Sequence, residues 1–320
     1  MDMEEKMNRF GFGVDIGGTT CKLGFFDDGG VLLDKWEIKT NTENSGNSIL
    51  DDIAKEINAK LTRDGIGKDS ILGIGIGVPG PVMSDGTVNK CVNLGWGVFN
   101  VEKEMEKKTG IKVKAANDAN IAALGEMWQG GAAGFSNVVM ITLGTGVGGG
   151  IIIEGKILSG AEGAGGELGH ILVDETETES CSCGKKGCLE QYASATGVVR
   201  MAKKKLLSSH APSVLEKKAV LTAKDIFDGA KNGDCTSMEL VEKLGEILGT
   251  ALATIACVTN PQIFIFGGGV SNAGKILLDV TKESFESKTF HICRNAKFAL
   301  AELGNDAGIY GGMRLVMEEN

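Results

Sequence analysis

The sequence predicts an α/β protein made of two domains with a ligand-binding cleft between them. Its length of 320 residues suits two domains as a rough guide. Strand-like and helix-like segments alternate along the chain in two successive series, which is typical of α/β domains. Two stretches, GVDIGGTTCKLGFF and MITLGTGVGGGIII, share one design of strand, Gly/Thr turn and strand. They indicate an internal repeat at the scale of a domain.

The first series of elements fills the N-terminal part of the chain. Apolar runs bounded by turn residues, such as the hairpin signal Asp28-Gly29-Gly30, predict strands. These strands cover residues 11–15, 21–26, 31–38, 71–78 and 112–115. Apolar residues at helical spacing from Ile49 to Leu61 predict a helix over 47–61. Two shorter helices are predicted over 101–108 and 119–128.

The second series begins after residue 136. It predicts strands over 137–143, 150–154 and 261–266, with a Gly-rich turn over 144–149. Helices are predicted over 191–207, 223–232, 236–258, 274–287 and 308–318. We therefore expect a small domain of residues 1–116 plus 310–320, and a large domain of residues 117–309.

Composition and charge narrow the classes of function. The net charge of −9 argues against a general nucleic-acid or anionic-membrane binder. The segment Met1–Phe10 has no apolar core of a signal peptide, and no apolar run is long enough to span a membrane. We expect a cytoplasmic protein with no membrane and no nucleic-acid partner. Glycine, at 48 residues, is about twice as frequent as usual, which favours tight turns and close backbone approach to a ligand.

Two Gly/Thr loops are candidate phosphate sites. In Asp15-Ile-Gly-Gly-Thr19 and Leu143-Gly-Thr-Gly146, backbone N–H groups and hydroxyls can hold phosphate oxygens, and the Asp can hold a magnesium-bound water. A plain hairpin turn explains the first loop equally well. The GxGxxG patterns that end at Gly80 and Gly149 are not dinucleotide fingerprints, because neither leads directly into a helix. The Gly-Lys-Ser/Thr of a P-loop is absent from the sequence.

One His and three Cys lie close together in the sequence: His170, Cys181, Cys183 and Cys188. Together they form a complete tetrahedral set for zinc, with no position left open for catalysis, so a metal here would be structural. The alternative is three free thiols beside an unrelated His. The five remaining cysteines are scattered, and we interpret them as small apolar residues in a reducing compartment.

Three acidic positions are candidates for substrate chemistry. Glu167 precedes His170 by three residues and Glu190 follows Cys188 by two, so zinc would fix both carboxylates, which suit the hydroxyls of a neutral sugar. Single surface acids are the alternative. Asn117-Asp118 opens a predicted helix, where either residue could be an N-cap. Asp118 could instead be a general base that accepts a proton from an attacking hydroxyl.

These motifs together resemble the ROK family of sugar kinases and repressors, within the actin-like and hexokinase-like (ribonuclease H-like) fold. The resemblance covers nearly the whole chain, and its most specific part is the zinc cluster with Glu190. The matching segments are 15–19, 80–81, 117–120, 143–146, 167–170, 181–190 and 267–269. Residues 117–128 and 193–197 resemble bacterial glucokinases that contain zinc.

The resemblance implies a role for each matching residue. Asp118 would be the catalytic base, and His170 would contact both zinc and sugar. The sugar-binding set would be Gly80, Asn117, Asp118, Glu167, His170 and Glu190. The nucleotide-binding set would be Asp15, Gly17, Gly18, Thr19, Thr20, Lys22, Gly144, Thr145, Gly146, Gly268 and Gly269. Zinc would be held by His170, Cys181, Cys183 and Cys188.

The family implies an ATP-dependent kinase that uses magnesium and converts glucose to glucose 6-phosphate, assembled as a homodimer or tetramer. A kinase for fructose, N-acetylglucosamine or N-acetylmannosamine is the alternative. A sugar-responsive repressor is disfavoured, because too few residues precede Asp15 for a helix-turn-helix and the chain is acidic. We also expect the two domains to close on the sugar, with hinges near residues 116–118 and 304–311.

Overall fold

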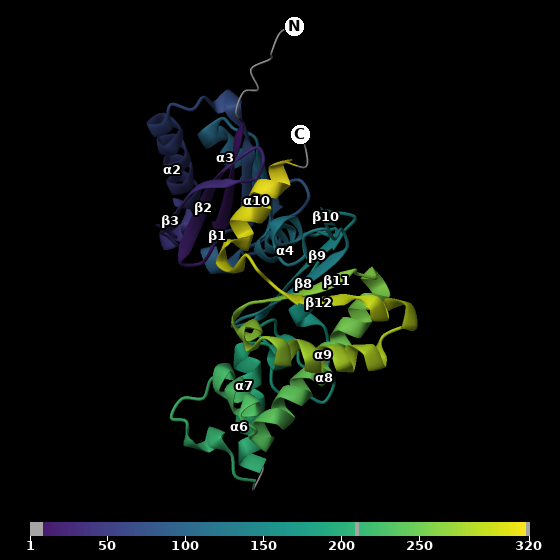
Figure 1. Cartoon of the computed structure of the whole chain (residues 1–320). Helices are drawn as coiled ribbons and strands as arrows, with labels where there is room; N and C mark the ends of the chain where they lie inside the picture. Colours follow the sequence, from purple (N-terminus) through teal and green to yellow (C-terminus); the bar gives the residue numbers. More distant parts are fainter. Residues whose placement is uncertain (1–8, 209–210, 318–320) are drawn as a thin grey trace. The chain divides into compact units, whose positions relative to one another are not determined.

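The computed structural model describes residues 9–208 and 211–317, and within them the chain forms two compact units. The first unit comprises Met1–Gly134, Gly155–Gly165 and Asn305–Asn320, and the second comprises Phe135–Glu154 and Gly166–Gly304. Each has its own sheet and its own covering helices (Figure 1). Most of the segment 1–10 and the end of the last predicted helix, Glu318, lie outside the described residues. None of the described helices has the length and apolar character needed to cross a membrane.

The sheet of the first unit has the strand order β3-β2-β1-β4-β7. Strands β1 to β3 form an antiparallel meander, whereas β4 and β7 run parallel to β1. The strands are β1 (Phe10–Ile16), β2 (Thr20–Asp27), β3 (Leu32–Lys39), β4 (Ile71–Val78) and β7 (Val113–Asn117). The main helices are α2 (Ile49–Asp64), α3 (Val101–Thr109), α4 (Asp118–Gln129) and α10 (Ala307–Met317). Short elements are α1 (Glu43–Gly46), β5 (Thr87–Val88) and β6 (Phe99–Asn100).

Alternating residues of the central strands explain how helices cover both faces of this sheet. Phe12 and Val14 of β1 belong to the core that also contains the buried residues of α2 and α3. On the other face, a Cβ at Gly13 or Gly75 would collide with the backbone of α10 at Ile309 or Gly312. Glycine at these alternating positions therefore lets α10 lie directly on the sheet.

The second unit repeats this arrangement. Its strands lie in the order β9-β8-β11-β12, with β8 antiparallel to β9 and parallel to β11, which is parallel to β12. These strands are β8 (Val138–Leu143), β9 (Val147–Ile153), β11 (Ile263–Gly267) and β12 (Lys297–Leu300), and the short β10 (Lys156–Ile157) follows β9 in the chain. The helices are α5 (Glu190–Ala193), α6 (Ala195–Ser208), α7 (Ala223–Lys231), α8 (Cys235–Thr259) and α9 (Lys275–Lys288).

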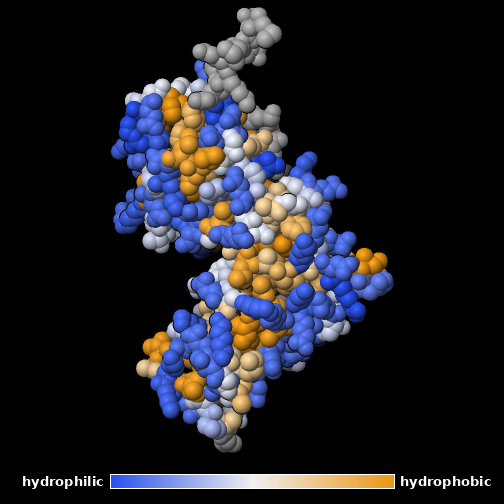
Figure 2. Space-filling view, viewed as in Figure 1, coloured by the Kyte–Doolittle hydropathy of each residue, from blue (hydrophilic) through white to orange (hydrophobic). Residues whose placement is uncertain are grey.

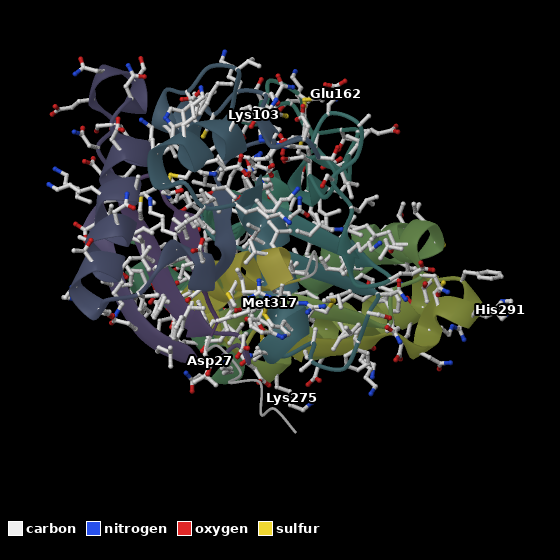
Figure 3. The ribbon with its side chains drawn as sticks, turned by 90° about the horizontal axis from the view of Figure 1, so that it is seen from above. Asp27, Lys103, Glu162, Lys275, His291 and Met317 are labelled. Carbon is white, nitrogen blue, oxygen red and sulfur yellow. The ribbon has the colours of Figure 1, made fainter. Side chains whose placement is uncertain are left out.

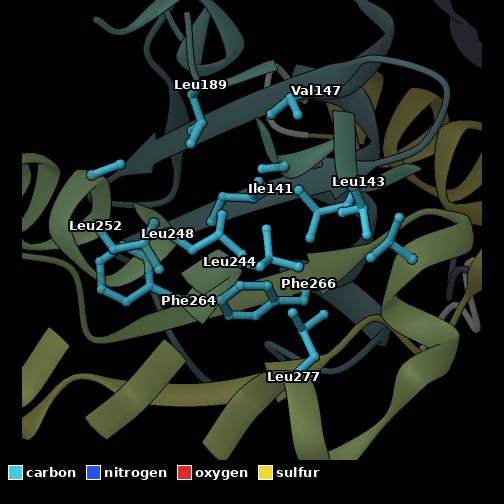
Figure 4. Packing of buried hydrophobic residues seen from close by; sticks show 14 of the residues in the cluster. Ile141, Leu143, Val147, Leu189, Leu244, Leu248, Leu252, Phe264, Phe266 and Leu277 are labelled. Atoms are coloured by element: carbon cyan, nitrogen blue, oxygen red, sulfur yellow. The ribbon is translucent and has the colours of Figure 1, made fainter. Parts of the chain in front are cut away.

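Its core lies between the sheet and helices α8 and α9. Leu244 and Leu248 of α8 meet Phe264 and Phe266 of β11 there, and all four are fully buried (Figure 4). Gly245 and Gly249 of α8 face α9, where a Cβ would collide with residues 280, 284 and 285. Small residues on α8 thus let the two helices pack closely while its leucines fill the core.

The structure confirms the α/β class, the two sheets and the internal repeat. Each predicted strand and helix of the two series matches an observed element in type. The predicted domain boundary differs from the observed units. The first unit continues through α4 to Gly134, because Gly125 of α4 and Gly311 of α10 bring these two helices into backbone contact.

Two local predictions were wrong, over residues 147–149 and 191–207, and some short strands were missed. Residues 147–149 belong to strand β9 rather than to the turn, and Gly149 is needed there because Leu168 and the Gly166 carbonyl pack on it. Strand β12 was not predicted. The helix predicted over 191–207 is interrupted at Ser194, whose extended backbone separates α5 from α6.

Candidate functional site

Asp15 and Asp118 lie next to each other at one edge of the first sheet. Asp15 is near the carboxyl end of β1, and Asp118 directly follows β7. Strand β4 lies between these two parallel strands, so all three carboxyl ends meet at the same edge. A Cβ on Gly77 of β4 would lie 3.5 Å from Asp15 Oδ1 and 3.7 Å from the Cα of Asp118. Gly77 therefore leaves open the space that separates the two acids.

Asn117, not Asp118, caps helix α4. The Asn117 side chain accepts hydrogen bonds from the backbone N–H groups of Ala119 (3.0 Å) and Asn120 (3.2 Å). Its amide also donates to the Gly80 carbonyl at 3.2 Å, which joins two residues of the predicted sugar-binding set. Asp118 is the first helical residue, is half-buried, and accepts a 2.8 Å bond from the Ala119 N–H through Oδ1. The capping role considered for Asp118 therefore belongs to its neighbour.

Burial raises the pKa of Asp15, and the ammonium group of Lys22 partly offsets this effect. The two residues are directly opposite each other in the β1–β2 ladder. Lys22 Nζ donates to the Asn305 carbonyl at 2.7 Å, close to the start of α10. A Cβ at Gly308 would lie 2.6 Å from Asp15 Cγ, so the first turn of α10 approaches this acid.

The first predicted phosphate loop is a short turn held by a residue that we did not predict. The Gly17 N–H donates to the Thr20 carbonyl at 3.0 Å. Thr40, which is buried, donates through its hydroxyl to the Gly17 carbonyl at 2.7 Å and through its backbone to the Thr19 carbonyl at 2.9 Å. Gly18 and Thr19 remain exposed. The turn therefore presents its tip to solvent while its base is fixed.

The second predicted phosphate loop is the turn of the β8–β9 hairpin in the other unit. A backbone hydrogen bond of 2.9 Å closes this turn, in which the Gly144 N–H donates to the Gly146 carbonyl. The start of α6 supports it, because the Thr196 hydroxyl donates to the Thr145 carbonyl at 3.0 Å. Gly268, with φ of 81°, follows β11 and packs on the backbone of Leu143. The structure thus brings Gly144–Gly146 and Gly268–Gly269 to one edge of this sheet.

Glu190 connects this loop to the cysteine cluster. Its Oε2 accepts a 3.1 Å bond from the Val147 N–H, and a Cβ on Gly146 would collide with this same oxygen. Its Oε1 accepts a 2.8 Å bond from the Ser182 hydroxyl and lies 3.7 Å from Cys181 Sγ. A carboxylate predicted to bind sugar therefore contacts a loop predicted to bind phosphate. Ser182 was not predicted, since nothing in the sequence distinguishes it from other loop serines.

The predicted zinc ligands come together. One ligand atom from each of His170, Cys181, Cys183 and Cys188 lies within 4.8 Å of the others. Cys183 Sγ and Cys188 Sγ are 3.7 Å apart, and Cys181 Sγ is 3.9 Å from His170 Nδ1. Zinc–sulfur bonds of about 2.3 Å place two tetrahedral sulfur ligands about 3.8 Å apart, so this spacing fits zinc.

Electrostatics in the cluster also suit a cation. Burial, together with hydrogen bonding of the Cys188 thiol to the neighbouring sulfurs, raises the pKa of Cys188 to about 12. A thiolate at this position would therefore require a cation close by. His291 lies at the periphery of the chain in the view of Figure 3 and is not part of the cluster. His210 lies outside the described residues.

Glu167 and His170 are both exposed: Glu167 directly precedes a single 3-10 turn, Leu168–His170, and His170 is its last residue. The His170 N–H donates to the Glu167 carbonyl at 3.2 Å, so the turn fixes the spacing of these two residues.

The predicted site residues form two groups, one in each unit of the chain. Asp15, Lys22, Gly80, Asn117, Asp118 and the loop 17–20 belong to the first unit. Gly144–Gly146, Glu167, His170, Glu190, Gly268–Gly269 and the cysteines belong to the second.

A network of charges missed by the sequence analysis anchors the far side of the cysteine loop to α6. Arg200 of α6 lies 2.6 Å from Glu177 and donates to the Gln191 carbonyl at 3.0 Å. The Tyr192 hydroxyl donates to Asp174 at 2.6 Å and to Glu177 at 2.9 Å. Long-range pairs of this kind leave no periodic pattern in a sequence.

Comparison with known proteins agrees with this geometry. The model of the ROK family matches residues 11–319. A glucokinase from Halalkalibacterium halodurans is 43% identical over 318 residues, which cover 98% of this chain and 96% of that protein. A glucokinase from Thermotoga maritima is 35% identical over 312 residues, which cover 96% of each chain.

A similar solved structure is that of a ROK family glucokinase from Streptomyces griseus in complex with glucose and AMPPNP. It is 34% identical, with a TM-score of 0.73, and the match covers 96% of this chain and 98% of that one. Because the match extends over almost the full length in both sequence and fold, the chain belongs to the ROK family.

Proposed function

We propose that this protein is an ATP-dependent glucokinase that converts glucose to glucose 6-phosphate. The observation that carries this proposal is the 43% identity with a glucokinase over 98% of the chain. The Streptomyces griseus relative supports it further, since that protein was solved with glucose and an ATP analogue. Asn117 caps helix α4, and Asp118 is half-buried. Asp118 is therefore well suited to proton transfer.

In the proposed reaction, Asp118 accepts the proton of the sugar's 6-hydroxyl as that oxygen attacks the γ-phosphorus. The new O–P bond forms while the bond between the γ-phosphorus and the bridging oxygen breaks, and ADP leaves. Backbone N–H groups of residues 17–20 and 144–146 would stabilise the charge on the phosphates. Magnesium bound to ATP would neutralise part of that charge, and Asp15 would hold one of the waters bound to that magnesium.

The sugar would be bound by Gly80, Asn117, Glu167, His170 and Glu190. Carboxylates and the imidazole can accept or donate hydrogen bonds to ring hydroxyls. A structural zinc held by His170, Cys181, Cys183 and Cys188 would keep Glu190 in place, because Cys181 and Ser182 both contact its carboxylate. Gly268 and Gly269 would lie on the adenosine side. We expect a cytoplasmic homodimer or tetramer.

The experiment is a coupled ADP-release assay over a panel of glucose, fructose, mannose, N-acetylglucosamine and N-acetylmannosamine. We expect kcat/KM to be highest for glucose, by tenfold or more. A preference of that size for another hexose would instead make the protein a kinase for that sugar. A chain that releases no ADP with any of them, at full zinc content, would contradict the proposal.

A further inference from the structure

A cavity in the first unit involves none of the residues assigned above. It has a volume of about 250 Å³, and its lining includes Ser45, Asn47, Trp96, Phe99, Glu104 and Lys108. The rings of Trp96 and Phe99 meet edge to face, with centroids 5.1 Å apart. Polar side chains therefore stand beside an aromatic pair in a space of monosaccharide size.

One wall of this cavity has a strained backbone. Asn44 and Ser45 have φ of 50° and 61°, and Gly46 continues the left-handed run with φ of 64°. Left-handed conformations are unfavourable for Asn and more so for Ser, and strain of this kind collects at functional sites. The run is held by a hydrogen bond of 3.0 Å from Trp96 Nε1 to the Gly46 carbonyl. The strained turn 44–46 and the aromatic pair Trp96 and Phe99 thus form one connected assembly of contacts.

This assembly is connected to the proposed substrate site through successive contacts. Trp96 and Cys91 exchange two backbone hydrogen bonds of 3.0 and 3.1 Å. Cys91 is fully buried, and its thiol donates to the Pro79 carbonyl at 3.1 Å. A Cβ on the next residue, Gly80, would lie 3.2 Å from Cys91 Cβ. Gly80 in turn accepts the hydrogen bond from Asn117, the cap of the helix that begins with Asp118.

The charges around the cavity favour a neutral ligand. Glu104 pairs with Lys107 at 2.7 Å, and Lys108 pairs with Asp51. The wall thus presents one balanced carboxylate and one balanced ammonium group. Trp96 is buried, with 5% of its surface exposed, and Phe99 is half-buried, so Phe99 offers the apolar surface of the cavity. An aromatic ring beside hydroxyl, amide and charged groups that can bond to hydroxyls suits a polyhydroxyl molecule. Lys108 is the cationic side chain among the lining residues named above, and Asp51 already balances its charge, so the cavity does not favour an anion.

We propose that this cavity binds a second neutral, hexose-sized polyhydroxyl molecule, and that its occupation tightens substrate binding through Trp96, Cys91 and Gly80. This goes beyond the proposed function, because it adds a site that takes no part in phosphoryl transfer. A ligand that orders the Trp96 loop lowers the cost of ordering Gly80 when the substrate binds, which produces positive cooperativity. For a ligand of this size in an open cavity we expect a Kd on the order of millimolar.

The test uses ¹⁹F NMR of protein labelled with 5-fluorotryptophan, with D-glucose as the probe. The chain has three tryptophans, so Trp36 and Trp128 serve as internal references, and Trp96→Phe assigns the third resonance. We expect a saturable millimolar shift of the Trp96 resonance. It should persist in Glu167→Ala, which removes a proposed substrate ligand in the other unit. Parent enzyme should show a Hill coefficient for glucose above 1.

Two variants change the lining of the cavity and leave the proposed catalytic residues as they are. Gly97→Leu fills it, because Gly97 lines the cavity and a Cβ there meets no atom within 4 Å. Glu104→Ala removes a polar group and only an exposed ion pair. Each should weaken the Trp96 response at least threefold and return the Hill coefficient to 1. Gly67→Leu is the matched control, since a Cβ there is equally unobstructed, and it should behave as the parent.

Several results would overturn the proposal. One is a Trp96 resonance that does not respond, or that responds equally in Gly97→Leu and the parent. Another is a response that disappears in Glu167→Ala, which would assign it to the substrate site. A parent that phosphorylates glucose but shows no second site would refute this inference alone. A cavity response in a chain without kinase activity would refute the proposed function alone.

Discussion

Asn117 and Asp118 begin the same helix but have separable roles, and one substitution tests this separation. Asp118→Asn keeps the size of the side chain, and Asn117 continues to cap α4 with its two backbone bonds. We expect kcat to fall by roughly 10²–10⁴, the usual contribution of general acid–base catalysis. Melting temperature and zinc content should not change. ADP release, thermal unfolding and metal analysis measure these three quantities.

Asn117→Ala is the complementary variant, since it removes the cap and leaves the carboxylate. It should lower the free energy of unfolding by about 0.5–2 kcal/mol. It should also raise the KM for glucose, because the hydrogen bond to Gly80 is lost. If Asp118→Asn turned over glucose within a few-fold of the parent, Asp118 would not be the base.

Gly146 tests the contact between the Gly/Thr turn and Glu190. A Cβ at Gly146 would displace Glu190 Oε2, whereas a Cβ at Gly144 would meet nothing closer than the Gly146 carbonyl at 4.0 Å. Gly146→Ala should therefore raise the KM for glucose about tenfold or more, and Gly144→Ala should raise it much less. Steady-state kinetics at saturating ATP make the comparison. Equal values of KM in the two variants would show that Glu190 does not bind the sugar.

For single residues, prediction from the sequence succeeded where a side chain stands next to a recognisable motif. Asp15, Asp118 and Glu190 could be singled out because each acid stands beside a Gly/Thr turn, a helix start or a cysteine cluster. Gly77 and Thr40 could not be singled out. Gly77 matters because two acids distant in sequence approach it, and Thr40 because it contacts a turn more than twenty residues away. Such roles depend on the tertiary fold alone.

Among the elements, the loop from Gly166 to Leu189 is the one that the proposed zinc would hold. Cys183→Ala removes one of four ligands, so we expect the zinc content to fall from about one per chain toward zero. The melting temperature should fall and the KM for glucose should rise, because the loop carries the contacts of Glu190. Elemental analysis by mass spectrometry measures the zinc. Cys257→Ala, which changes an exposed cysteine outside the cluster, is the control. Full activity after complete removal of zinc would contradict this role.

The same loop has a second anchor, and its pH dependence can be predicted. Burial would by itself raise the pKa of Glu177, but hydrogen bonds from the Glu179 backbone, Arg200 and Tyr192 lower it to about 2. An unfolded Glu titrates near 4.3. The ionised Glu177 therefore stabilises the fold above about pH 4.3, and this stabilisation is lost as the pH falls toward 2.

Glu177→Gln removes this titration. At pH 7 the variant should melt a few degrees below the parent, since hydrogen bonds to a charged group contribute about 1.5–3 kcal/mol. The difference should shrink as the pH is lowered from 5 to 3. Thermal unfolding across this range provides the measurement. Glu179→Gln is the control, because its side chain is 52% exposed and that of Glu177 is 5% exposed. A difference that stays constant with pH would refute the assignment.

Element prediction succeeded where periodicity was strong and failed where tertiary contacts decide. The apolar spacing of α2 and the alternation of β1 follow directly from the sequence. Gly148 and Gly149 suggested a turn, yet both belong to β9, where Leu168 packs on the space that a side chain at Gly149 would fill. Ser194 breaks a helical pattern because its hydroxyl donates to the Glu190 carbonyl and accepts the Gly197 N–H. The local sequence around these glycines and Ser194 does not reveal such contacts.

For the whole molecule, the repeat seen in the sequence is also a repeat of topology. Each unit begins with an antiparallel hairpin, β1–β2 or β8–β9, and continues with parallel strands on the far side of its first strand. The hairpin turns are the two predicted phosphate loops. Figure 2 shows a largely hydrophilic surface with separate hydrophobic patches on the side in view.

The chain passes from one unit to the other at 134–135, 154–155, 165–166 and 304–305. The expected hinge over 304–311 includes one of these crossings, whereas the one at 116–118 lies inside the first unit. A glycine with positive φ stands at every crossing: Gly134, Gly155, Gly166 and Gly304. Glycine accommodates large changes of φ and ψ at little cost, so these positions are suited to act as hinges.

We therefore predict that glucose changes the relation between the units. The proposed base, Asp118, belongs to the first unit and the proposed phosphate-binding Thr145 to the second, and the proposed reaction would use both residues. Closure would also exclude water, which competes with the sugar as phosphoryl acceptor. The radius of gyration from small-angle X-ray scattering should decrease at saturating glucose. In Gly134→Val, a β-branched residue opposes the φ of 88°, so the decrease should be smaller and kcat and KM should both change. Gly65→Val imposes a similar strain at φ of 66° within the first unit and should close as the parent does. An unchanged radius in the parent, or equal closure in both variants, would show that these glycines are not hinges for the reaction.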